Sequence, residues 1–184
     1  MNVLIPSLTV PDPAVKGGFV LYLDFDGVLH PEDVHMQTGR GPFIASPVGH
    51  KLFEHAGLLA EALGPYPELR IVLSTSWVRV YRSVRRITRK LPPELSARVV
   101  GATYHGAMDA ESFKAAPRGM QVWSDVLRRQ PADWLALDDD YLHWPAWCRD
   151  KLVRTDEILG VSAPAVLAEL RAKLAAMPEK AGDG

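Results

Sequence analysis

The chain has 184 residues, of which 47% are hydrophobic, and its 21 Lys+Arg nearly balance its 22 Asp+Glu, for a formal net charge of -1. This near-neutral charge argues against a protein that coats nucleic acid through bulk electrostatics, and the single cysteine, Cys148, excludes an intrachain disulfide. Because no run reaches the about 18 apolar residues of a membrane span and residues 1–18 lack a basic signal-peptide region, we expect a cytoplasmic protein that binds no membrane.

The chain is expected to fold as one domain without an obligate protein partner. Residues 1–18 are predicted to be an irregular lead-in because prolines and the Gly17-Gly18 pair interrupt them. Residues 19–177 would form the domain, and residues 178–184 a frayed tail.

Apolar runs rich in β-branched and aromatic residues predict five strands, at 19–25, 70–73, 99–100, 134–137 and 152–153. Helices are predicted between and after them: from a Ser46-Pro47 cap to Leu63, after Trp77 on the spacing of Val80, Val84, Ile87 and Leu91, at 118–129 and at 163–177. Strands that are apolar on both faces and alternate with helices predict an α/β protein, a Rossmann-like three-layer sandwich with a mainly parallel sheet.

The first predicted strand ends in two aspartates, Asp24 and Asp26, followed by Gly27. Side chains alternate along a strand, so the two carboxylates share a face, and Gly27 lets the backbone turn away. Two like charges so close need a cation between them or a proton on one of them. Carboxylate oxygens suit Mg²⁺. A hairpin turn is the alternative interpretation, but the flanking residues do not alternate as hairpin strands do.

Two further strand ends carry polar side chains. The second predicted strand is followed by Ser74, Thr75 and Ser76, whose hydroxyl and N–H groups can bind an anion. The fourth is followed by three acids, Asp138, Asp139 and Asp140. A solvated acidic turn is the simplest interpretation of the acids alone, but the cation required by the first pair makes them candidate metal ligands.

In this order, the strand ends resemble the motifs of the haloacid dehalogenase (HAD) superfamily, mostly magnesium-dependent phosphohydrolases with an aspartate nucleophile. The matching motifs are DxDG at Asp24 to Gly27, the threonine Thr75 after the second strand, a basic residue that opens a helix, and the pair Asp138-Asp139. The segments DFDGVLH and LSTSW are most similar to small phosphatase-like domains found alone or in multi-domain RNA repair proteins. The resemblance covers residues 19–160.

The resemblance implies a HAD-like fold and a role for each matched residue. Asp24 would be the nucleophile, and Asp26 the acid/base that protonates the leaving oxygen and then activates water. Thr75 would stabilise the transferred phosphoryl group. Magnesium would be bound by Asp24, the backbone carbonyl of Asp26, and Asp138 or Asp139.

The catalytic cation has two candidates. The superfamily prefers lysine, which favours Lys114, whereas the position at a helix start favours Arg118; we favour Arg118 and keep Lys114 as a substrate-binding candidate. Either residue could also be a surface cation. The other candidates for phosphate or substrate binding are Gly27, His30, Ser76 and Trp77.

No segment is long enough for a cap domain, since 19 residues separate Gly27 from Pro47 and the 103–117 segment is also short. The site is therefore expected to be open, with at most a flap at 30–45, and an open site fits a bulky phosphoester better than a small metabolite.

The helix after Trp77 is expected to carry a basic stripe of Arg79, Arg82, Arg86 and Arg89. A solvated face is the simplest interpretation of such a stripe, and the alternative is a track for a nucleic-acid backbone. Trp77, Trp144 and Trp147 lie in loops expected on the catalytic side, where they could stack on bases, although tryptophans more often pack internally.

These features predict a magnesium-dependent phosphomonoester hydrolase that acts through an aspartyl-phosphate, on a phosphorylated small molecule or, as we favour, a nucleotide or nucleic-acid end. The alternatives are a general small-molecule phosphatase and a catalytically weak phosphate-binding or regulatory domain. The presence of Asp26 speaks against the weak domain. A receiver-type phosphoacceptor would carry its acidic pair before the phosphorylated aspartate, which is the reverse of the order here.

Overall fold

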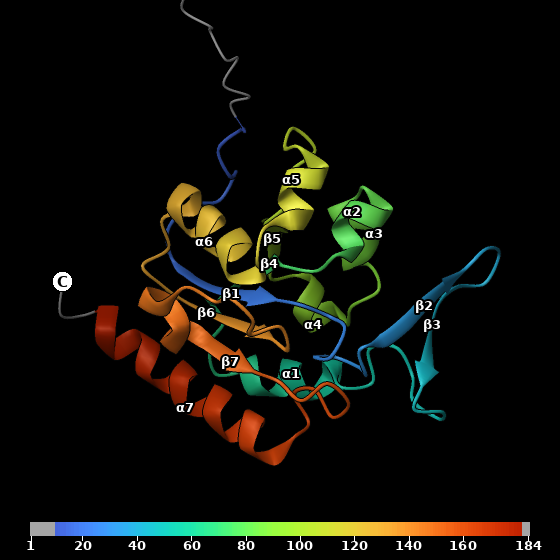
Figure 1. The fold of residues 1–184 in the computed structure, drawn as a ribbon. Helices are drawn as coiled ribbons and strands as arrows, with labels where there is room; N and C mark the ends of the chain where they lie inside the picture. Colours follow the sequence, from blue (N-terminus) through green and yellow to red (C-terminus); the bar gives the residue numbers. More distant parts are fainter. Residues whose placement is uncertain (1–9, 182–184) are drawn as a thin grey trace, which may run out of the picture.

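The computed structural model describes residues 10–181. Its centre is a five-stranded sheet in the order β5-β4-β1-β6-β7, with all neighbouring strands parallel (Figure 1). The strands are β1 (Phe19–Leu23), β4 (Arg70–Leu73), β5 (Val99–Ala102), β6 (Asp133–Asp138) and β7 (Leu152–Arg154). The predicted α/β class with a parallel sheet is confirmed.

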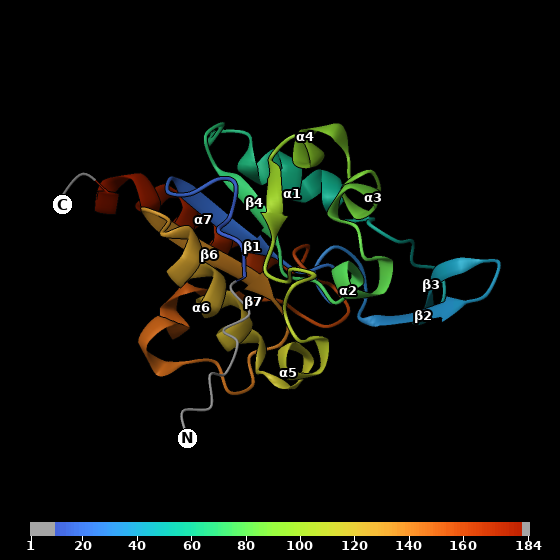
Figure 2. The ribbon, with the colours of Figure 1, turned by 90° about the horizontal axis from the view of Figure 1, so that it is seen from above.

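The other elements are helices and one hairpin. The helices are α1 (Ala56–Leu63), α2 (Trp77–Tyr81), α3 (Val84–Thr88), α4 (Pro93–Ser96), α5 (Ala110–Ala115), α6 (Arg118–Arg129), the 3-10 helix η1 (Ala146–Lys151) and α7 (Pro164–Ala181). An antiparallel hairpin, β2 (Asp33–Gln37) and β3 (Gly41–Ser46), projects away from the sheet (Figures 1 and 2).

Helices cover both faces of the sheet, α1 and α7 on one side and α6 on the other (Figure 1). Side chains of successive β1 residues pack on opposite faces of the sheet. Leu21 and Leu23 belong to the core that contains α1 and α7, whereas Val20 and Tyr22 pack in the core on the α6 side. Since both faces are buried, the strand is apolar along its whole length.

The helix predicted from Ser46-Pro47 to Leu63 begins only at Ala56, so the Ser-Pro cap is wrong. Ser46 instead ends β3, where it pairs with Asp33 of β2. Phe53 then has a φ of 61°, which a right-handed α-helix does not permit. The segment expected to be a flap is therefore largely the β2–β3 hairpin.

The single helix predicted after Trp77 is broken into α2 and α3. Arg82 ends α2 with a left-handed φ of 50°, and Ser83 caps α3 by accepting a hydrogen bond from the N–H of Arg86. Val80 is consequently 61% exposed instead of lying on a buried face. The four arginines of the expected stripe do not lie on one helix, so the single stripe is wrong.

The ends of the described chain are held against the domain differently. Residues 10–18 form no helix or strand, but the Gly17 N–H donates to the carbonyl of Arg129, and the Arg129 guanidinium donates to the carbonyl of Val15. At the other end α7 continues to Ala181, past the expected boundary at Met177. The remaining parts of the expected lead-in and tail, 1–9 and 182–184, lie outside the described residues. Within 10–181, no helix combines the length and the apolar character that crossing a membrane requires.

Gly160 supports the loop after β1 and yields a stability prediction. Its φ is +54°, and a Cβ there would overlap the carbonyl of Val28, which accepts a hydrogen bond from the N–H of Val161. Gly160→Ala should therefore lower the free energy of unfolding in urea by about 2 kcal/mol or more. Gly57→Ala, in α1 with open space around it, should instead raise it by up to about 1 kcal/mol. Equal stability of the Gly160 variant and the wild type would contradict the packing described.

Candidate active site

The carboxyl ends of β1 and β6 bring three aspartates together. Carboxylate oxygens of Asp24, Asp138 and Asp139 all lie within 4.8 Å of one another. Asp24 is 4% exposed and Asp138 is 1% exposed. Buried acids at this density repel each other unless they are protonated or paired with a cation.

Asp24 lies at the centre of the site. Its Oδ1 accepts a hydrogen bond of 2.8 Å from the N–H of Phe25, and its Oδ2 lies 3.2 Å from Nη2 of Arg118. Burial raises the pKa of Asp24, and the Arg118 guanidinium opposes that rise. The hydroxyl of Thr75 also favours the ionised carboxylate.

Arg118 is the cation that the structure places among the acids. Its Nε lies 3.2 Å from Oδ2 of Asp138, its Nη2 faces Asp24, and its Nη1 donates to the carbonyl of Ser74. Lys114, on α5, is exposed to solvent. Of the two candidates from the sequence, Arg118 is thus the one in contact with the carboxylates.

Gly27 allows the two acidic strand ends to approach. Its φ is +68°, and a Cβ there would overlap the carboxylate of Asp139. Burial, followed by the charges of Asp24 and Glu32, raises the pKa of Asp139 to about 7. In this arrangement Gly27 contributes to the site by making room for Asp139.

The three aspartates fit a divalent metal ion. They offer only oxygen ligands, which hard cations such as Mg²⁺ prefer. Oδ2 of Asp138 is buried and lies 3.2 Å from Nε of Arg118, but it accepts no hydrogen bond within the described residues. Burial and the charge of Asp24 raise the pKa of Asp138 well above its usual value. A metal ion bound by the three carboxylates would offset the repulsion that the Arg118 guanidinium only partly balances.

Asp26 is not one of the three clustered aspartates, and two side chains hold its carboxylate. Nε1 of Trp77 donates to both of its oxygens, at 3.0 and 3.1 Å, and Nε2 of His30 lies 3.0 Å from Oδ1. Because Nδ1 of His30 accepts the N–H of Phe53, a neutral His30 carries its proton on Nε2 and donates it to Asp26. The Asp26 side chain remains 27% exposed.

His30 and Trp77 were expected to contact substrate, and the structure places them elsewhere. They are 0% and 5% exposed and lie behind Asp26, in edge-on aromatic packing with Phe53. Both therefore position Asp26. The four-residue spacing from Asp26 to His30 was a signal for this contact, whereas the contact of Trp77 spans 51 positions along the chain and leaves no local trace.

A small basic pocket lies beside Asp24, at the end of β4. Its volume is about 180 Å³, and its lining includes Thr75, Ser76, Arg79, Lys114 and Arg118. The three cationic side chains of the lining, Arg79, Lys114 and Arg118, outnumber its one acid, Asp140, so the pocket suits an anion. The predicted anion-binding residues Thr75, Ser76 and Lys114 are thus brought together with Arg118.

Trp144 and Trp147, the two other tryptophans considered for base stacking, both pack against protein side chains or backbone. Trp144 is 2% exposed and packs against Gly119. Trp147 is exposed, but its ring contacts Trp123 of α6, which in turn contacts Trp134 near the start of β6. These contacts place Trp147 towards the start of β6, away from the strand end that carries Asp138. The expected catalytic-side position of Trp147 is wrong.

Comparison with known proteins agrees with this geometry. A sequence model of the family described as "HAD domain in Swiss Army Knife RNA repair proteins" matches residues 20–166. Searches of curated proteins and of solved structures found no match to the chain. The matched range includes every acidic strand end described above, as well as Arg118.

Proposed function

The chain belongs to the family of HAD domains in Swiss Army Knife RNA repair proteins, and on this premise we propose that it is a magnesium-dependent phosphomonoesterase that forms an aspartyl-phosphate on Asp24. The observation that carries the proposal is the juxtaposition of a buried carboxylate, Asp24, with the guanidinium of Arg118 and the basic pocket beside them. A nucleophile, a cation and an anion-binding pocket are the parts that phosphoryl transfer needs.

In the first step a carboxylate oxygen of Asp24 attacks phosphorus while the bond to the leaving oxygen breaks. Asp26 donates a proton to that oxygen, so the product leaves as an alcohol. Arg118 and Thr75 stabilise the charge that spreads over the equatorial oxygens.

In the second step Asp26, now ionised, removes a proton from water, and the water oxygen attacks phosphorus. Phosphate is released and Asp24 is regenerated. Trp77 and His30 keep the Asp26 carboxylate in one orientation through both steps.

Asp24, Asp138 and Asp139 would hold the magnesium ion. When bound, the ion would offset the negative charge of the phosphoryl group and of the carboxylates around it.

The favoured substrate is a nucleotide or nucleic-acid end. The basic pocket supports this choice, and so does the lack of a cap domain within residues 10–181, where the insertions form only the β2–β3 hairpin and α5. A general small-molecule phosphatase is the second candidate. A catalytically weak phosphate-binding domain fits less well, because Asp26 is held by two donors and its side chain remains 27% exposed.

A phosphatase screen tests the proposal. Sugar phosphates, mononucleotides, p-nitrophenyl phosphate and oligonucleotides with a 5′ or 3′ phosphate would be compared with magnesium and with a chelator. We expect phosphate release that requires magnesium and is fastest on nucleotide or oligonucleotide substrates. Release from every substrate in the presence of the chelator would contradict the metal requirement.

Trp77→Phe tests the positioning of Asp26. The variant keeps an aromatic ring against Phe25 and Phe53 but removes the N–H that donates to the carboxylate. We expect kcat to fall about tenfold, since one charge-assisted hydrogen bond is lost while His30 still holds Asp26. Trp147→Phe, away from the catalytic edge, is the control and should leave kcat unchanged. Equal kcat in the two variants would show that the Trp77 N–H does not position Asp26 for the reaction.

A further inference from the structure

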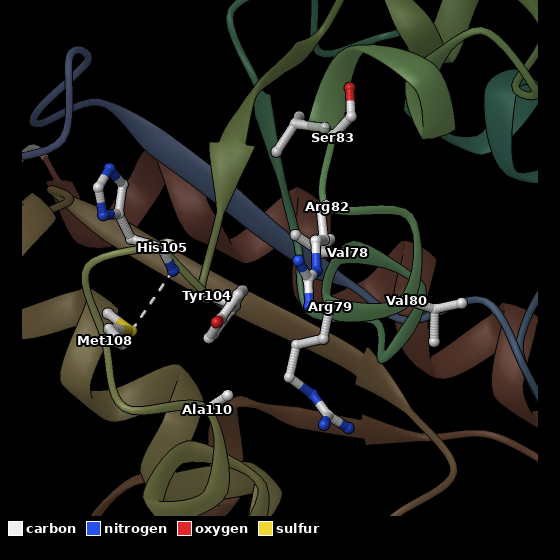
Figure 3. Close-up of a pocket in the computed structure, with 11 residues that line it drawn as sticks. Val78, Arg79, Val80, Arg82, Ser83, Tyr104, His105, Met108 and Ala110 are labelled. Atoms are coloured by element: carbon white, nitrogen blue, oxygen red, sulfur yellow. Dashed lines mark hydrogen bonds between the residues drawn. The ribbon is translucent and has the colours of Figure 1, made fainter.

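A larger cavity adjoins the basic pocket on the side of α2. Its volume is about 650 Å³, and it lies between the α2–α3 turn and the segment from Tyr104 to Ala110 (Figure 3). Arg79 lines both this cavity and the basic pocket, so the two meet at that side chain. A substrate whose phosphate occupies the pocket can therefore continue past Arg79 into the cavity.

The lining of the cavity combines positive charge with apolar surface. Arg79 and Arg82 supply the charge, and none of the described residues that line the cavity is acidic. Val80 is 61% exposed, and Tyr104 and Met108 stand on the opposite wall (Figure 3). Such a surface complements a ligand that carries both an anionic group and a flat apolar ring.

The break in the predicted helix determines which arginines face the cavity. Because the chain turns at Arg82, only Arg79 and Arg82 line it, whereas Arg85 and Arg89 line a separate depression beside α3. The opposite wall is held in place by the ring of Phe113, which packs edge-on against Tyr104 at 5.1 Å. This contact connects the Tyr104 wall of the cavity to α5.

Resting on the proposed function, we propose that this cavity binds the second nucleotide of a single-stranded nucleic acid whose terminal phosphate is hydrolysed at Asp24. Arg79 and Arg82 contact the phosphodiester that links the two nucleotides, and Tyr104 and Met108 contact the second base. Charge complementarity and the shared Arg79 side chain favour this occupant. A volume of about 650 Å³ lies in the usual range for small-molecule sites.

The test compares a mononucleotide with dinucleotides of RNA and of DNA that carry the same terminal phosphate, at the 5′ or the 3′ end. For the preferred end, the KM of the dinucleotide should be about tenfold lower than that of the mononucleotide, because one added phosphodiester and one base are bound. Arg82→Gln should reduce this KM ratio towards one. Arg89→Gln removes the same charge outside the cavity and should leave the ratio as in the wild type.

Binding separates failure of the subsite from failure of the proposed activity. Fluorescence anisotropy of a labelled oligonucleotide with a terminal phosphate would be measured on the Asp24→Asn protein, with and without Arg82→Gln and Arg89→Gln. Oligonucleotide binding that is weakened by Arg82→Gln but not by Arg89→Gln supports the subsite, even if no phosphoester is hydrolysed. Equal binding by the two arginine variants overturns the subsite while leaving the phosphatase proposal standing. The subsite is also overturned if a phosphopeptide binds the Asp24→Asn protein as tightly as the oligonucleotide does and loses as much affinity with Arg82→Gln.

Discussion

Replacing Asp24 by Asn should lower kcat below about 1% of the wild-type value on every phosphoester, because a carboxamide cannot attack phosphorus. The side chains have the same shape, so the pocket should persist. Removing one of three clustered carboxylates also relieves repulsion, and the thermal midpoint without metal should not fall by more than a few degrees. The measurements are steady-state hydrolysis and thermal unfolding of the same preparations.

Asp150→Asn is the matched control, since it makes the same change at an exposed position in η1. It should retain full activity. Retention of more than a few per cent of the wild-type rate by Asp24→Asn would remove Asp24 from the nucleophile role.

Magnesium at millimolar concentration should raise the thermal midpoint of the wild-type protein by several degrees. A ligand at 100 times its Kd stabilises the folded state by about 2.7 kcal/mol, and about 1 kcal/mol corresponds to about 2–4 °C in a chain of this size. Replacing both Asp138 and Asp139 by Asn should erase the shift, because two of the three clustered ligands are lost. Asp140→Asn is the matched control from the same acidic run; its carboxylate is exposed, and the shift should remain.

The increase in thermal midpoint caused by magnesium should also become larger as the pH rises. The folded-state pKa of Asp139 is raised to about 7 from an ordinary value of 3.8, so its ionisation destabilises the metal-free protein as the pH rises through that window. Metal binding requires the ionised form. A larger magnesium shift at about pH 8 than at about pH 6 is therefore expected. An undiminished shift in the Asp138/Asp139 double variant would place the metal outside the acidic cluster.

The part of the site that could be predicted from the sequence is the part that local pattern determines. An apolar strand that ends in Asp24 and Asp26, and another that ends in Asp138 and Asp139, must bring their acids to one edge if the strands are parallel. Neighbouring strands β1 and β6 do so. Arg118 was favoured over Lys114 from its place at a helix start, and the helix does begin there.

The part that could not be predicted depends on long-range contacts or on single backbone angles. The apolar spacing from Val80 to Leu91 is that of one helix, and only the left-handed φ of Arg82 divides it. Ser46 resembles a helix cap but pairs in a hairpin with Asp33. Trp77 resembles a surface aromatic beside a phosphate site, yet its indole is buried against Asp26.

The central claim is that the phosphoryl group is transferred to Asp24, and the most direct test is to trap it there. The protein would be quenched in acid during turnover with magnesium, reduced with borohydride, which converts an acyl phosphate to an alcohol, digested and analysed by mass spectrometry. We expect Asp24 to be found as homoserine in protein quenched during turnover, and not in protein quenched without substrate or in the Asp24→Asn variant. Modification of a different residue, or turnover with inversion at a chiral phosphorus and no modified Asp24, would contradict the account.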